Sequence, residues 1–142
     1  MEKVTENKTF EVGGRKYSTI PLTGFDVLDL DRVVAAKWAE IHSRVSKSGL
    51  STEGMSDEES KKAVGLAVAN ELTKVFAEMP REEYRNLLEL TLSTTVAMGG
   101  KNEKNVKLSD AETIGTFFAG HVSDLPEVLI AVWEANRLSP FA

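Results

Sequence analysis

The two histidines are the residues best suited to chemistry in this chain, but their sequence surroundings form no reactive or metal-binding motif. His42 and His121 lie far apart, and neither has a second histidine, a thiol or a carboxylate at the spacing of a metal-binding helix. The chain has no cysteine, which excludes disulfides, thiolate zinc sites and cysteine nucleophiles. We therefore predict no metal site and expect structural roles for both imidazoles.

Clustered carboxylates are the next candidates, for calcium binding or acid–base catalysis. The run Asp26, Asp29 and Asp31 lacks the loop spacing, central glycine and closing glutamate of an EF-hand. The pairs Glu58-Glu59 and Glu82-Glu83 stand where helices are expected to begin, and a helix N-terminus favours carboxylates. We interpret all of them as helix-start residues.

Glycine-rich and nucleophile motifs are also missing. The Gly13-Gly14 pair is not followed by the helix and the Lys-Ser or Lys-Thr pair of a phosphate-binding loop, and no Gly-x-Ser-x-Gly elbow occurs. We predict no catalytic or cofactor-binding residues and no small-molecule substrate, and expect that the protein is not an enzyme. A small enzyme stays an alternative, favoured by a deep polar pocket with His42 or His121 beside carboxylates.

The bulk composition is that of one ordinary folded domain. A chain of 142 residues buries roughly 70% of its unfolded surface, and its 42% hydrophobic and 27% charged residues are unlike a disordered chain. The net charge of −5, with scattered basic residues, argues against nucleic acid as the main partner. No apolar run approaches a signal peptide or the ~20 residues of a membrane span, so we expect a cytoplasmic protein.

Residues 8–20 have the pattern of a β-hairpin, because two short β-favouring runs flank Gly13-Gly14. Phe10, Val12 and Tyr17 supply its apolar face. An isolated two-stranded ribbon is marginal in water, so the hairpin must pack on helices or pair with another chain through its free edge.

Apolar residues recur every three and four positions along residues 24–138, which predicts about five helices. The first helix follows Pro21 and ends before a loop at 46–55. A capping box of Ser56 and Glu59 begins the second, whose apolar stripe is Val64, Ala67, Val68, Leu72, Val75, Phe76 and Met79.

Pro80 separates the second helix from a third, which the pattern extends over residues 81–98 to the Gly99-Gly100 pair. After a polar connector at 101–108, a second capping box of Ser109 and Glu112 begins the fourth helix, which runs through Val122. Asp124 with Pro126 begins the fifth. The predicted fold is mainly α: a small N-terminal β-hairpin and a compact bundle of about five helices in a single domain, 1–142, with a tail at 139–142.

Large apolar residues supply the candidate binding surfaces. Trp38 and Trp133 fall on helix stripes, where core packing is the simplest interpretation and a partner-binding groove the alternative. The apolar residues at the C-terminus dock either on the body of the protein or on another protein. We predict partner contacts at Phe10, Val12, Tyr17, Trp133, Leu138 and Phe141.

Together these features resemble the tail assembly chaperones of long-tailed bacteriophages and prophages. The similarity lies in the hairpin from Phe10 to Tyr17, the helical body, the acidic capping segment 108–112 and the closing helix 128–141. That last segment carries Asn136 and then Phe141 beside Pro140, which is similar to the ending of many family members.

The resemblance implies a non-enzymatic protein of the host cytoplasm that binds the long helical tape-measure protein and helps tail-tube protein to polymerise around it. Apolar helix surfaces and a β edge would cover apolar stripes of the tape-measure protein until tube protein displaces them. Self-association and a longer, frameshifted form of the protein stay open.

Two other binding functions stay open as well. A helical DNA-binding or regulatory module needs a basic recognition helix, whereas the helix pairs of this chain have acidic starts. Another phage structural adaptor, such as a tail-completion protein, would differ by remaining in the finished particle.

Overall fold

Helices make up most of the chain in the computed structural model, which describes residues 7–138 except 48, 50, 101 and 102. The tail predicted at 139–142 lies outside the described residues. The helices are α1 (Phe25–Lys47), α2 (Asp57–Glu78), α3 (Arg81–Leu92), α4 (Ala111–Phe118) and α5 (Leu125–Ala135), and a short 3-10 helix, η1 (Val122–Asp124), leads into α5. The mainly α prediction is confirmed.

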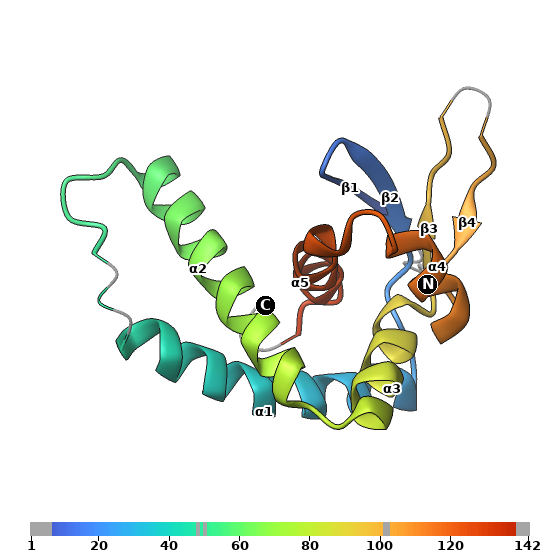
Figure 1. Ribbon diagram of the computed structural model, residues 1–142, viewed down its shortest axis with the longest axis horizontal. Helices are drawn as coiled ribbons and strands as arrows, with labels where there is room; N and C mark the ends of the chain where they lie inside the picture. Colours follow the sequence, from blue (N-terminus) through green and yellow to red (C-terminus); the bar gives the residue numbers. More distant parts are fainter. Residues whose placement is uncertain (1–6, 48, 50, 101–102, 139–142) are drawn as a thin grey trace, which may run out of the picture.

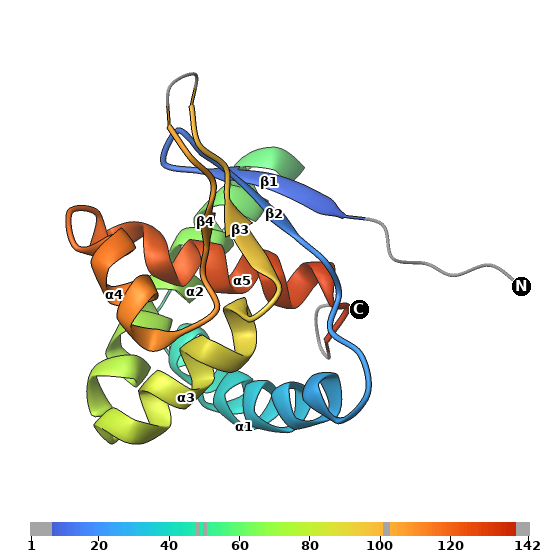
Figure 2. The same ribbon diagram turned by 90° about the vertical axis from the view of Figure 1, so that its right-hand side faces the viewer.

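The predicted N-terminal hairpin is present, but it is part of a larger sheet. β1 (Lys8–Val12) and β2 (Arg15–Thr19) pair around Gly13 and Gly14, which both have the positive φ that a two-residue turn of this kind requires. β3 (Thr95–Ala97) and β4 (Val106–Lys107) extend the sheet in the order β1-β2-β3-β4, all antiparallel (Figure 2). The prediction of a lone hairpin is therefore wrong.

The third helix is shorter than predicted because its last residues form β3. After Leu92 the chain carries a run of β-branched residues, which favour extended backbone where a strand is available for pairing. β2 provides that pairing: Tyr17 lies opposite Ala97, and the buried hydroxyls of Thr19 and Thr95 share a hydrogen bond of 2.8 Å. Helical continuation to residue 98 is thus wrong, and β4 lies within the segment predicted as a polar connector.

The helix starts agree with the sequence at α2 and α5 and differ at α4. At α2 the Glu59 amide donates to Ser56 Oγ (3.1 Å) and the Ser56 amide donates to Glu59 Oε1 (3.0 Å), which is the predicted capping box. At α4 the cap is Asp110 rather than Ser109: its Oδ1 accepts from the Thr113 amide at 2.9 Å. Aspartate caps a helix as well as serine does, so the neighbouring position takes the role.

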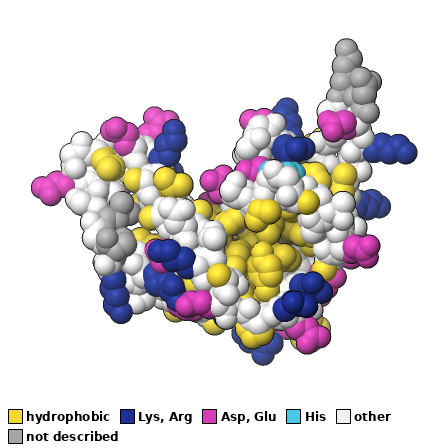
Figure 3. Space-filling model, viewed as in Figure 1, with side chains coloured by type: hydrophobic (Ala, Val, Ile, Leu, Met, Phe, Trp, Pro, Cys, Tyr) yellow, Lys and Arg dark blue, Asp and Glu magenta, His cyan; other side chains and the backbone are white. Residues whose placement is uncertain are grey.

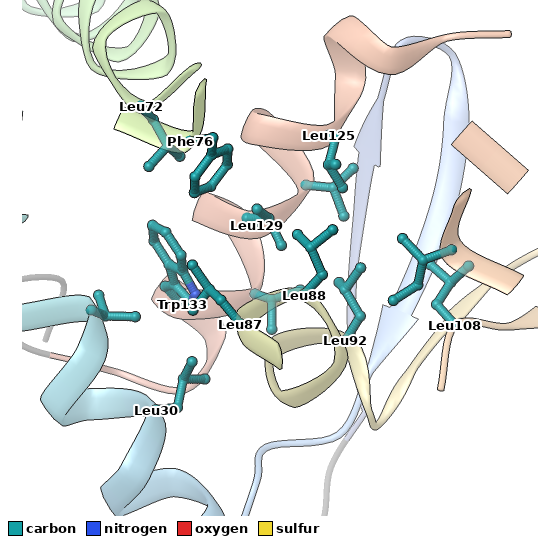
Figure 4. Close-up of a cluster of buried hydrophobic side chains, with 14 of the residues drawn as sticks. Leu30, Leu72, Phe76, Leu87, Leu88, Leu92, Leu108, Leu125, Leu129 and Trp133 are labelled. Atoms are coloured by element: carbon teal, nitrogen blue, oxygen red, sulfur yellow. The ribbon is translucent and has the colours of Figure 1, made fainter. Parts of the chain in front are cut away.

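The core gathers around α5, which crosses one face of the sheet (Figure 2). Side chains from α2, α3 and α5 point into one apolar cluster with Trp133 among them (Figure 4). Trp133 is buried, and its indole Nε1 donates to the buried Thr91 Oγ1 on α3 at 3.2 Å. This bond satisfies the only polar atom of the indole within the apolar interior.

α1 and α2 are the longest helices of the described part of the chain, and residues 51–56 between them lie far from the sheet (Figure 1). The predicted loop at 46–55 thus falls between them, with α1 reaching Lys47. Arg44 on α1 forms ion pairs with Glu40 and with Glu78 at the end of α2, so the two helices are also joined by charge. Within the described part of the chain, no helix combines the length and the apolarity needed to cross a membrane.

Candidate partner-binding groove

Most of the residues predicted to contact a partner belong to the interior. Val12, Tyr17, Trp133 and Leu138 are buried, and Phe10 is half-buried against Tyr17 with 5.4 Å between the ring centroids. Phe141 lies outside the described residues. In this conformation the buried side chains have almost no surface to offer a partner, so they build the scaffold that positions a surface elsewhere.

Tyr17 shows how fully the hairpin is committed to the core. Its ring packs between Phe10 of β1 and Phe118 of α4, and its hydroxyl has no hydrogen-bond partner among the described residues. Burial, and secondly the nearby Asp124 carboxylate, raise the pKa of Tyr17 to about 12, with Arg15 opposing them. The phenol therefore stays neutral and acts as a packing group.

Leu138 docks on the body of the protein through the C-terminal cap of α5. Arg137 adopts a left-handed conformation (φ 53°) and its amide donates to Glu134 O, while the Leu138 amide donates to Trp133 O at 3.2 Å. These two bonds form a Schellman motif, in which the residue after the left-handed position packs back on the helix. The first part of the apolar C-terminus is thus explained by folding.

The histidines occupy separate environments. His42 is exposed on α1 with its ring 6.3 Å from that of Trp38, whereas His121 precedes η1 and packs against Phe117 and Phe118. The buried His121 Nε2 has no partner among the described residues. No group of three or more histidine, aspartate or glutamate side chains in the described ranges is arranged to hold a metal ion.

An open apolar surface lies along α2. Three adjoining pockets, of about 710, 800 and 1060 Å³, follow each other on this side of the fold. We call them the outer, middle and inner pockets. The outer and middle pockets share Leu66 and Glu127, and the middle and inner pockets share Tyr84, Val122 and Leu125. The middle pocket therefore joins the outer and inner pockets, which share no residue with each other. We call the continuous groove that the three pockets form the α2 groove.

The walls of the α2 groove come from helices distant in sequence. α2 lines the outer and middle pockets from Glu59 to Ala77, a length of about 27 Å at 1.5 Å per residue. The start of α5 and η1 form the opposite wall, and α3 and α4 close the inner pocket around Leu88, Ile114 and Phe118. Figure 3 shows the resulting apolar area in the hollowed middle of this face.

Two exposed residues mark the rims of the groove: Leu66 on α2 is 60% exposed and Val122 in η1 is 63% exposed. The predicted fourth helix placed Val122 on its apolar stripe, but α4 ends at Phe118. Leu66 was missed because it lies outside the predicted stripe of α2. Conversely Val64, which that stripe includes, is partly exposed and lines with Trp38 a fourth pocket, which adjoins the outer pocket at Gly65 and Ile130. The sequence signal for this surface was Leu66 itself, an apolar residue that lies off the predicted apolar stripe of α2.

An open apolar groove between helices is a surface on which an amphipathic helix of another polypeptide can pack. The comparison with protein families gives the particular class. Residues 13–141 match the model of the family described as phage tail assembly chaperone protein, TAC, so this chain belongs to that family. Comparisons with curated proteins and with solved structures gave no match.

Family membership confirms the resemblance found in the sequence and assigns the protein a chaperone role in phage tail assembly, with partners among the proteins of that assembly. The matched range contains all five helices and therefore every wall of the α2 groove.

Proposed function

We propose that this chaperone binds the tape-measure protein by holding amphipathic helical segments of that protein in the α2 groove. It acts by contact, without catalysis, in the cytoplasm of the host cell. The observation that carries the proposal is a continuous apolar groove about 27 Å long, which accommodates about five turns of a helix.

The shape of the groove suits a helix better than an extended strand. Its walls are helical surfaces, and a helix laid between two others packs its side chains into the grooves between theirs at 8–10 Å between axes. The apolar stripe of an amphipathic helix presents side chains at every third and fourth residue, and these would enter the successive pockets.

The energy of such binding comes from the exposed rims. Full burial of a leucine or valine side chain stabilises by about 1.5–3 kcal/mol, and Leu66 and Val122 both have more than half of their surface available. A few such contacts against the cost of association give moderate affinity. Moderate affinity fits a chaperone whose partner must be released when tail-tube protein polymerises around it.

The test is co-expression with the tape-measure protein of the same phage. Leu66→Asp places a charge in the groove, and we expect it to weaken binding at least tenfold, about 1.4 kcal/mol, and so to reduce the amount of soluble tape-measure protein. Val122→Asp on the opposite rim should act in the same way.

The matched control is Leu28→Asp, because Leu28 is a leucine of similar exposure (62%) on α1, away from the groove. We expect Leu28→Asp to keep the tape-measure protein soluble. All three variants, Leu66→Asp, Val122→Asp and Leu28→Asp, should keep the wild-type melting temperature. Normal binding by Leu66→Asp and Val122→Asp would show that the groove is not the binding site. Failure of the wild-type chain to hold tape-measure protein would end the proposed function.

A further inference from the structure

The charges along the α2 groove are separated by sign. At the outer pocket the charged lining residues are Glu59, Glu127 and Lys62, so the carboxylates are in excess. At the inner pocket they are Arg81, Arg85 and Glu112, so the guanidinium groups are in excess. A ligand that spans the groove therefore meets a negative end and a positive end.

Neighbouring residues reinforce the separation. The first turn of α2, beside the outer pocket, carries Asp57 and Glu58 in addition to Glu59, and Lys61 follows them, so the carboxylates stay in excess there. At the other end, neither Arg81 nor Arg85 forms an ion pair with another described residue, and the nearby Glu83 is turned toward Lys37 of α1, with which it pairs at 3.3 Å. The arginines are thus free to attract acidic groups in the inner pocket.

From this charge pattern we infer that the helix held in the groove runs parallel to α2, with its amino-terminal end and basic side chains beside Glu59 and Glu127 and its carboxyl-terminal end and acidic side chains beside Arg81 and Arg85. This inference rests on the proposed function, and it adds the direction and the charge pattern of the bound segment.

The size of the competing effects supports this direction. The dipole of α2 by itself favours an antiparallel neighbour, but it amounts to about half an elementary charge at each end. The side chains at each end of the groove carry whole charges, and the first-turn carboxylates of α2 already oppose its positive end. The charges are exposed and screened, so they set orientation and association rate more than affinity.

The absence of cysteine in the chain allows a direct test of orientation. Met55→Cys places one thiol at the outer pocket, and Thr116→Cys places one at the inner pocket. Each variant is labelled with a benzophenone maleimide, purified as a complex with the tape-measure protein of the same phage, and irradiated. Mass spectrometry then identifies the tape-measure residues that each position has captured.

Within each captured helical segment, we expect links from position 55 to lie closer to the amino terminus of the tape-measure protein than links from position 116. The reverse order, or both orders in equal amounts, would overturn the inference while leaving the proposed function intact. Failure to capture any tape-measure protein, with wild-type complex also absent, would remove the proposed function and this inference with it.

Reversing the charge of the arginines at the inner pocket tests the charge argument separately. Arg81→Glu with Arg85→Glu should slow association with the tape-measure protein about tenfold at low ionic strength, and much less at 1 M salt, where the screening length is about 3 Å. The fold should be kept, because Arg81 lies in the first turn of α3, where acidic residues are favourable, and Arg85 is exposed. The control is Arg32→Glu with Lys47→Glu on α1, which makes the same change in net charge away from the groove and should leave the association rate nearly unchanged. Equal slowing by both pairs would contradict a role for the groove arginines.

Discussion

The core around Trp133 and the α2 groove are built from the same helices, but their apolar residues are buried in the core and exposed in the groove. In the core, stripes from α2, α3 and α5 meet one another, and Trp133 and Thr91 satisfy each other within the protein. In the groove, Leu66 and Val122 meet no such counterpart and remain exposed. Whether an apolar side chain of these helices packs within the chain or remains exposed is thus shown only by the fold.

The largest difference between the two regions should appear in stability. Trp133→Ala removes the largest buried side chain, leaves a cavity and strips the Thr91 hydroxyl of its donor, so we expect a loss of about 3–5 kcal/mol in the free energy of unfolding. Leu66→Ala in the groove should change it by less than about 0.5 kcal/mol. Urea denaturation of both variants measures this contrast, and similar losses would contradict the division into core and groove.

A smaller effect is expected where the sheet joins the core. Thr95→Val leaves the buried Thr19 hydroxyl without its partner, which should cost about 1–3 kcal/mol. The double variant Thr19→Val/Thr95→Val removes both hydroxyls and should recover most of the loss. A double-mutant cycle by chemical denaturation gives the coupling between them, and additive losses would mean that the two hydroxyls do not interact.

The same threonine pair explains why the sheet was only partly predictable. Long helices such as α1 and α2 carry their own periodicity, and the capping box of Ser56 with Glu59 marks the start of α2. β3 has three residues and depends on pairing with β2 across about 80 residues of sequence, and the two residues of β4 pair in turn with β3. The β-branched residues of this segment favour extended backbone only where a strand is available for pairing, so the apolar pattern alone predicted a helix up to the glycine pair.

The groove was less predictable than the fold, for a related reason. Its walls combine the outer side of α2 with η1 and the start of α5, and these elements are brought together only by tertiary packing. The large aromatic residues drew the prediction toward Trp133 and Tyr17, which the core uses. Leu66, a leucine outside the buried stripe of its helix, was visible in the sequence but stands alone there.

Loss of a helix cap beside the groove should lower the stability less than loss of the core contacts does. Ser56→Ala removes the cap of α2 next to the outer pocket and should cost about 1 kcal/mol of stability. At α4, Asp110→Ala should cost a similar amount and Ser109→Ala almost nothing, because Asp110 is the residue that accepts from the Thr113 amide. Thermal denaturation of the three variants checks the assignment, and a larger loss for Ser109→Ala than for Asp110→Ala would reverse it.

The smallest expected effect is a loss of stability at acid pH, and it comes from exposed capping carboxylates rather than from the core. Hydrogen bonds from Ser56 lower the pKa of Glu59, and hydrogen bonds from Thr113 lower the pKa of Asp110. Because each pKa is lower in the folded than in the unfolded chain, the stability that each carboxylate contributes is complete above its ordinary pKa and is lost as the pH falls through the folded value. Both side chains are exposed, so the loss should be modest and weakened by salt.

The measurement is the free energy of unfolding between pH 7 and pH 3 for the wild type and for Asp110→Asn. The variant lacks the titrating group at α4 and should show a shallower decline, whereas identical slopes would mean that the Asp110 cap does not form in solution.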